Sequence, residues 1–243
     1  MKTKLRRLLI PGVILACAVL MMSLKYEAPS EAEMLVMKYA KEKQVAFTEY
    51  PESLLKLLED NPETKEFVLD YPFRESWAVD LSRYDGDRGV PLFLQWDRQW
   101  GYEMCHGEFV GVNGSAAMCL AMAGYCISDG SSQFSPDKII KFAEKNDYRD
   151  AALICQGGAA LGLKVTSIAW EKAKVTAYLK NGDPIIASMG PGGDFDNFVV
   201  LTGYREGMVS LRDPDSRINS EKQWAFEELA GQMRNLWVIQ SNN

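Results

Sequence analysis

The sequence contains a single histidine, His106, and no pair of cysteines in CxxC spacing. Structural zinc sites use several cysteine and histidine ligands at set intervals, so these shortages argue against such a site. Asp194, Asp196 and Asp213 offer carboxylates instead, but their spacing matches no standard calcium-binding loop. We therefore expect no metal and no cofactor. The five cysteines are Cys17, Cys105, Cys119, Cys126 and Cys155.

The sequence also lacks an excess of positive charge. It has 27 Lys and Arg against 33 Asp and Glu, which gives a net charge of -6 and a pI near 5.0. Nucleic-acid binding calls for clustered basic residues, so we expect no nucleic-acid partner. Internal repeats and low-complexity stretches are missing as well. With 47% hydrophobic and 25% charged residues, the composition is that of an ordinary globular protein.

The first 24 residues predict a membrane-targeting segment. Four basic residues precede a run of roughly seventeen mostly apolar residues (8–24), at the lower edge of what spans a bilayer. No small-x-small cleavage site closes this run, so we expect an uncleaved signal anchor. This single-pass transmembrane helix would hold the rest of the chain outside the cytoplasm, at the cell membrane. The alternatives are a cleaved signal peptide that releases a secreted protein, and a lipoprotein signal at Cys17.

Residues 25–89 predict a helical stalk or collar ahead of the main domain. Ser30 followed by Glu33 indicates a capping box at the start of the first helix. Two further short helices are expected at 51–60 and 63–69, where Asn61-Pro62 separates them. A weak strand is expected at 77–81, and the turn cluster at 85–89 ends the segment.

Residues 90–243 predict one domain in which helices precede most of the sheet, an α+β layout. The helix from 116 should pack against the strand at 198–204, which would bring Ser115 and Asn197 within side-chain reach. Helices are expected at 116–127, 135–145, 151–161, 172–180 and 225–234. Ser135-Pro136 opens the second of these, and Gly182 lies just past the end of the fourth. Strands are expected at 90–97, 164–169, 184–189, 197–204, 208–212 and 237–240.

Ser115 stands at the start of the most apolar of these helices. It follows the breaker pair Asn113-Gly114, which predicts that Ser115 is the N-cap, at the positive end of the helix dipole. Cysteine peptidases place their nucleophile at such an end, because it lowers the pKa of a thiol. Here the position holds a serine.

Four motifs occur in order along the domain, and together they carry a resemblance. They are Val90-Pro-Leu-Phe-Leu-Gln-Trp-Asp-Arg-Gln-Trp-Gly-Tyr102, Cys119-Leu-Ala-Met122, Phe198-Val-Val-Leu-Thr-Gly-Tyr204 and Asp213-Pro-Asp-Ser216. They resemble the C39-like group of papain-like cysteine peptidases, bacterial relatives of the peptidases that cut bacteriocin leaders. The resemblance covers most of residues 50–240 and implies a papain-like fold with a peptidase site.

The resemblance also implies four functional positions. In the family a cysteine at a helix start attacks the carbonyl, a histidine from the sheet deprotonates it, an acid orients the histidine, and a glutamine helps form the oxyanion hole. Gln95 matches the glutamine and Asp213 the acid. The nucleophile position falls on Ser115 and the base position on Asn197. Cys119 takes the position of a second, non-catalytic cysteine.

The changes at Ser115 and Asn197 remove both the thiolate and its base. A serine hydroxyl depends on an adjacent base, and general-base assistance is worth about 10²–10⁴-fold. The sequence therefore predicts no intact catalytic residue and favours a pseudopeptidase that binds a peptide or protein. The alternative is an active cysteine peptidase with displaced residues, for which Cys119 and the neighbours Cys105 and His106 are the candidates.

Overall fold

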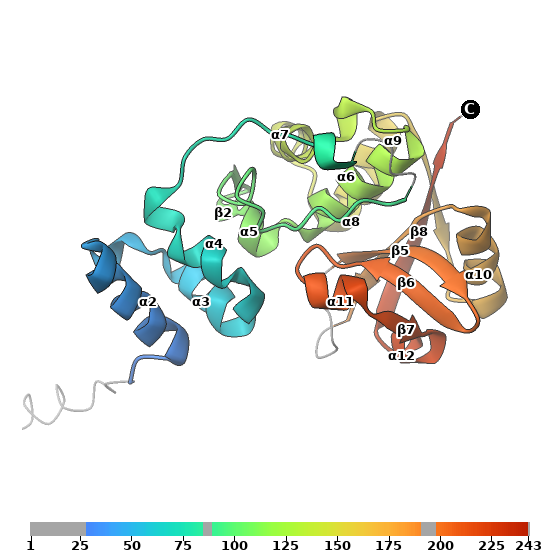
Figure 1. The fold of residues 1–243 in the computed structure, drawn as a ribbon. Coiled ribbons are helices and arrows are strands. Elements are labelled where there is room, and N and C mark those ends of the chain that lie inside the picture. The colour runs from blue at the N-terminus through green and yellow to red at the C-terminus, as the bar shows by residue number, and fades with distance from the viewer. Residues whose placement is uncertain (1–27, 85–88, 191–197, 243) are drawn as a thin grey trace, which may run out of the picture.

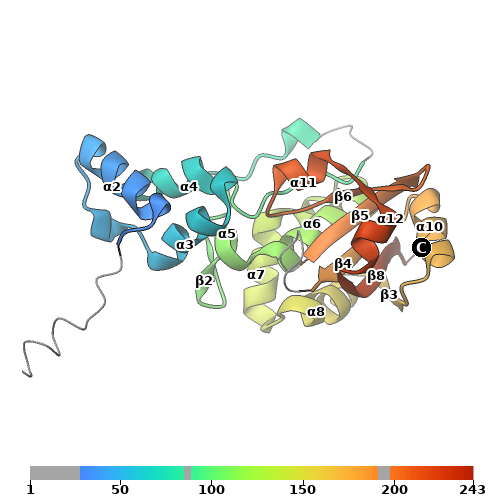
Figure 2. The ribbon, with the colours of Figure 1, turned by 90° about the horizontal axis from the view of Figure 1, so that it is seen from below.

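The chain folds into three parts that lie in a row. The computed structural model describes residues 28–84, 89–190 and 198–242. A collar of short helices (residues 30–73) lies at one end, a helical layer around α6 lies in the middle, and a sheet lies at the other end (Figure 1). The same order is visible in the perpendicular view (Figure 2). The expected α+β class is confirmed.

The sheet has six strands, antiparallel throughout, in the order β3-β8-β4-β5-β6-β7. β8 lies inside the sheet, where Val238 pairs with Thr166 of β3 and with Ile185 of β4. Side chains alternate between two faces, as strand geometry requires. The strands are β3 (Leu163–Ile168), β4 (Ile185–Met189), β5 (Phe198–Arg205), β6 (Met208–Arg212), β7 (Gln223–Ala225) and β8 (Met233–Ser241).

Helices cover both faces of this sheet. Val200 of β5 belongs to the core formed with α6, whereas its neighbours Val199 and Leu201 belong to the core formed with α10 and α12. The expected packing of the helix from Ser115 against this strand is thus confirmed. The helices on the second face are α10 (Lys172–Asn181), which ends at Gly182 as expected, and α12 (Phe226–Ala230).

The middle layer surrounds α6 (Ser115–Ile127), which is buried along its length from residue 115 to 125. A helix that is apolar on all sides belongs in a core, and α6 packs between β5 and α7. At Gly124 an added Cβ would lie 2.2 Å from the ring of Phe134, so only glycine allows this approach. The other helices here are α5 (Val110–Asn113), α7 (Pro136–Asn146), α8 (Asp150–Ala152) and α9 (Gly158–Ala160).

The collar has its own core and is docked firmly on the middle layer. Its capping box is confirmed: Ser30 Oγ accepts from the Glu33 backbone N–H at 3.2 Å, and Glu33 Oε2 accepts from the Ser30 backbone N–H at 2.8 Å. Phe67 makes the docking contact, because its ring stacks on Tyr102 with centroids 4.3 Å apart. The collar helices are α2 (Glu31–Lys43), α3 (Glu52–Asp60) and α4 (Lys65–Leu69).

Two expected strands and one helix boundary are wrong. Residues 77–81 and 90–97 contain no strand. In the second segment Val90, Phe93 and Leu94 are buried, but the backbone makes isolated bonds, such as Gln95 N–H to the Pro214 carbonyl at 2.8 Å, and no ladder. The helix expected at 225–234 ends at Ala230, since β8 takes the residues from Met233 onward.

Several expectations fall outside the described residues. These are the signal anchor at 1–24, the base position Asn197, and the carboxylates Asp194 and Asp196. The closeness of Ser115 and Asn197 therefore stays a prediction. Within residues 28–84, 89–190 and 198–242, no helix combines the length and apolar character needed to cross a bilayer.

Candidate functional site

Ser115 is the first residue of α6 and is almost fully buried. Its predicted N-cap role is wrong: Gly114 is the N-cap, and no side chain caps this helix end. Glycine is required at 114 because a Cβ there would lie 2.4 Å from the carbonyl oxygen of Val110. The Ser115 hydroxyl nevertheless lies at the positive end of the helix, where a helix-start nucleophile would be.

Gln95 lies buried against the loop that follows β6. Its Nε2 donates to the Gly111 carbonyl at 3.2 Å and to Asp215 Oδ1 at 3.1 Å. Its Oε1 is buried and has no hydrogen-bond partner among the described residues. Both amide hydrogens are thus committed to oxygens of the protein itself. In this arrangement Gln95 ties α5 to the loop after β6 and offers no free N–H to an oxyanion.

Asp213 is a buried carboxyl group at the end of β6. It accepts hydrogen bonds from Asn219 Nδ2 at 2.8 Å and from the Asp215 backbone N–H at 2.9 Å. Burial raises its pKa to about 7, and the charges of Asp215 and Glu63 add to the rise, whereas the two hydrogen bonds oppose it. Desolvation therefore outweighs hydrogen bonding, and burial favours the neutral carboxyl group.

Cys119 lies one turn along α6 from Ser115 and is completely buried. Burial, followed by the negative charge of Asp213, raises the pKa of its thiol well above the ordinary value. The thiol therefore stays protonated and inaccessible, which disfavours Cys119 as a displaced nucleophile. Asp215 joins Asp213 to Gln95, because its backbone N–H donates to Asp213 Oδ1 and its Oδ1 accepts from Gln95 Nε2. Asp213 acts electrostatically on Cys119, so we treat these four residues as one cluster.

His106 lies apart from this cluster, on a hairpin that the sequence did not predict. The hairpin pairs β1 (Met104–Cys105) with β2 (Glu108–Phe109) and packs against α7. Among the described residues, the imidazole bonds to the Tyr148 carbonyl and faces Glu144 and Asp147, and it makes no hydrogen bond to Ser115 or Cys119.

Cys105, the neighbour of His106, does not form a thiolate–imidazole pair with it in this structure. Burial, and after it the carboxylate of Glu144, raises the pKa of the Cys105 thiol to about 11. A thiol in this state is a poor nucleophile at neutral pH. The two neighbours were candidates for displaced catalytic residues, and the structure instead places carboxylates of α7 and of the loop after it beside His106.

The collar contributes residues to the site that sequence reasoning missed. Asn61 Nδ2 donates to the Asp215 carbonyl at 2.7 Å, and Glu63 accepts from Ser216 Oγ at 2.5 Å and from the Arg217 backbone N–H at 3.0 Å. Glu63 and Ser216 are more than 150 positions apart in the sequence, so no local sequence pattern predicts their contact. A cavity of about 340 Å³ lies at this junction, lined by Ser53, Lys56, Leu57, Asp60, Asn61, Gln95, Glu108, Val112 and Asp215.

Comparison with solved structures finds peptidase domains of streptococcal transporters. The peptidase domain of Streptococcus ComA, a bifunctional ABC transporter involved in a quorum sensing pathway, is 16% identical; the match covers 53% of this chain and 91% of that chain, with a TM-score of 0.42. The peptidase domain of Streptococcus mutans ComA, solved with a small-molecule inhibitor, is 15% identical over 51% of this chain and 88% of that chain, with a TM-score of 0.34. No family model and no curated protein sequence matches the chain.

Proposed function

We propose that this chain is a pseudopeptidase of C39-like fold, anchored at the outer side of the cell membrane, that binds a peptide or protein segment without cleaving it. The observation that supports this best is the position of the only imidazole. His106 is bonded to Tyr148 and held against α7, so neither Ser115 nor Cys119 is hydrogen-bonded to an imidazole among the described residues. Asn197, at the predicted base position, offers an amide that accepts no proton.

The cavity at the collar junction is the binding region that we propose. Its lining includes the carboxylates of Asp60, Glu108 and Asp215 and a single ammonium group, Lys56, which is already paired with Asp60 at 2.9 Å. Acceptors therefore outnumber donors. A ligand with donor-only cationic groups, such as the Lys and Arg side chains of a basic peptide, matches this lining.

The proposal is tested with the full chain in detergent, a thiol-reactive peptide probe and a peptide library. The native chain should show neither labelling nor cleavage. The double variant Ser115→Cys, Asn197→His should regain labelling, because it restores a thiol and a base at the two predicted positions.

The single variant Ser115→Cys is the matched control, since it has the thiol without the base. It should react about 10²–10⁴-fold more slowly than the double variant. Equal labelling rates in the two variants would show that position 197 does not supply the base. Labelling of the native chain at Cys119 or Cys105, together with cleavage, would favour the alternative of an active cysteine peptidase.

A further inference from the structure

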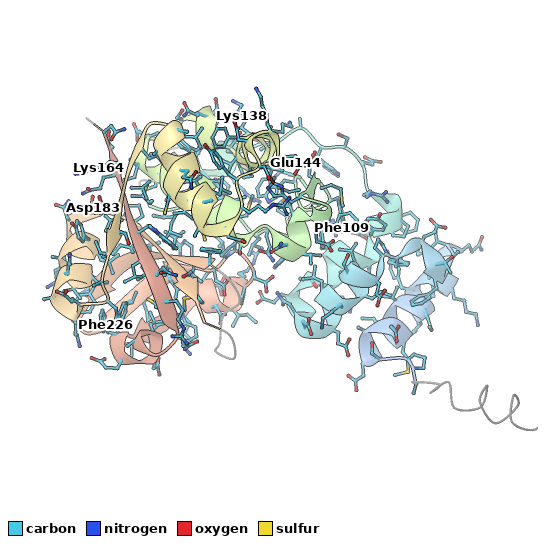
Figure 3. All side chains as sticks on the ribbon, turned by 180° about the vertical axis from the view of Figure 1, so that it is seen from behind. Phe109, Lys138, Glu144, Lys164, Asp183 and Phe226 are labelled. Atoms are coloured by element: carbon cyan, nitrogen blue, oxygen red, sulfur yellow. The ribbon has the colours of Figure 1, made fainter. Side chains whose placement is uncertain are left out.

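We propose that the hairpin turn at His106 and the end of α7 form a binding site for one zinc-type divalent metal ion. The ligands are Cys105 Sγ, His106 Nδ1 and a carboxylate oxygen of Glu144. One ligand atom from each of these residues lies within 4.8 Å of the others. Figure 3 shows Glu144 on the side of α7 that faces the hairpin segment carrying Phe109. The site is separate from the cluster around Gln95 and Asp213, and it does not depend on the function proposed above.

The hydrogen bond of His106 to Tyr148 assigns the tautomer of the ring. Nε2 lies 3.1 Å from the Tyr148 carbonyl oxygen, which can only accept, so Nε2 carries a proton. In the neutral ring Nδ1 then has no proton and carries a lone pair that can bind a metal ion. This nitrogen lies near the carboxylate oxygens of Glu144 and Asp147. Metal-bound histidines are held in this way, with the second ring nitrogen donating to a backbone carbonyl.

The distances around Nδ1 match a metal polyhedron better than hydrogen bonds. Nδ1 lies 3.4 Å from Glu144 Oε2 and 3.5 Å from Asp147 Oδ1. N–H···O bonds are usually about 2.7–3.2 Å long. In a tetrahedral zinc site with bonds of about 2.0–2.1 Å, two ligand atoms are separated by roughly 3.4 Å. His106 Nδ1 and Glu144 Oε2 are thus spaced as neighbouring ligands of a single cation.

The backbone fixes this arrangement. His106 and Gly107 form the hairpin turn with φ of 55° and 87°, a left-handed conformation that is uncommon for residues other than glycine. The His106 backbone N–H donates to Glu144 Oε2 and so ties the turn to α7. A non-glycine residue is therefore kept in a costly conformation at the point where its side chain meets a thiol and a carboxylate.

The ligand types indicate zinc over magnesium or calcium. A thiolate and an imidazole with one carboxylate suit zinc and its analogue cobalt, whereas magnesium and calcium prefer oxygen ligands alone. Asp147 is bonded to Arg149 Nε at 3.1 Å, so we assign the fourth position to water. A cavity of about 110 Å³ beside Cys105 and His106, which reaches Gly114 and Ala116 at the start of α6, provides the space.

The experiment titrates cobalt(II) into the full chain, reduced, in detergent and without a histidine tag. The native chain should bind one cobalt(II) ion with a thiolate-to-cobalt absorption band and the visible bands of tetrahedral cobalt, and zinc should displace it. Thermal unfolding should move to higher temperature as zinc is added. His106→Asn is the sharpest variant, because asparagine tolerates the left-handed turn but removes the imidazole.

Cys105→Ser and His106→Asn should each weaken cobalt(II) binding roughly tenfold or more, and Cys105→Ser should abolish the thiolate band. The matched controls are Cys155→Ser and Glu103→Gln, which change a cysteine and an acid outside the cluster and should bind as the native chain does. Near-ultraviolet circular dichroism without metal confirms that each variant folds. A native chain with no thiolate band at millimolar cobalt(II), or with the same band in Cys105→Ser, overturns the proposal.

Discussion

Asp213 is buried with a pKa near 7, so its titration affects stability. The unfolded chain releases this proton near the ordinary pKa of 3.8, whereas the folded chain keeps it up to about pH 7. Between these values the folded state binds more protons than the unfolded state. The contribution of Asp213 to the free energy of unfolding therefore falls as pH rises from 4 to 7, by at most about 4 kcal/mol, and is constant above that.

Urea unfolding of the native chain and of Asp213→Asn from pH 4 to 8 measures this effect. The variant cannot ionise at position 213. The free energy of unfolding of the native chain should therefore fall relative to that of the variant from pH 4 to 7, and the two curves should run parallel above pH 7. Parallel curves over the whole range would show that Asp213 ionises in the folded chain as it does in the unfolded one.

Motif order singled out Gln95, Ser115 and Asp213, and the structure buries all three polar side chains. Asn197, which the same motifs single out, lies outside the described residues, so its role stays a prediction. The partners that determine the state of Asp213 were not predictable, because Asn219 and Glu63 reach it only through the folding of a loop and the docking of the collar. Glu144 lies 38 positions after His106. The short spacings of known metal-binding motifs do not include a separation of this length, so the sequence did not predict the pair.

A charged side chain of the collar caps a helix of the sheet domain. Glu63 accepts from the N–H groups of Arg217 and Ile218 at the start of α11 (Arg217–Glu221). Anions stabilise a helix N-terminus by about 0.3–1 kcal/mol, and a hydrogen bond to a charged group contributes about 1.5–3 kcal/mol. Glu63→Gln should therefore lower the free energy of unfolding by about 1–2 kcal/mol.

Urea unfolding at pH 7.5 measures this loss, with Glu59→Gln as the control. Glu59 is an exposed acid on α3 of the same collar, and its variant should stay within about 0.5 kcal/mol of the native chain. A Glu63→Gln variant as stable as Glu59→Gln would show that the cap contributes nothing to the docking of the collar.

Elements with strong local signals were predictable, and those formed by tertiary contacts were not. The capping box at Ser30, the Ser135-Pro136 helix start and Gly182 after α10 each marked a boundary correctly. The run from Val90 to Leu94 is apolar because it is buried, and burial without alternation does not distinguish a strand from an irregular segment. The two-residue strands of the hairpin are too short to give a periodic signal.

For the whole molecule we predict retention at the cell membrane, with the collar and domain outside. The basis is sequence alone, since a basic segment precedes an apolar run with no clear cleavage site. Fractionation should place the full-length protein in the membrane pellet, where protease added outside the cell removes the domain. Protein found mainly in the cytosol, or released after losing its first residues, would contradict the anchor.

The position of β8 has a consequence for synthesis. Within the described sheet β3 pairs only with β8, although some 65 residues separate the start of β8 from the end of β3. A chain that emerges from the ribosome, or from an export channel, in order from its N-terminus can assemble the collar early. Strands β4 to β7 can pair with one another as they emerge, but β3 stays unpaired until β8 has emerged. Over that interval the nascent domain exposes apolar strands, and this is when a chaperone would have to hold it.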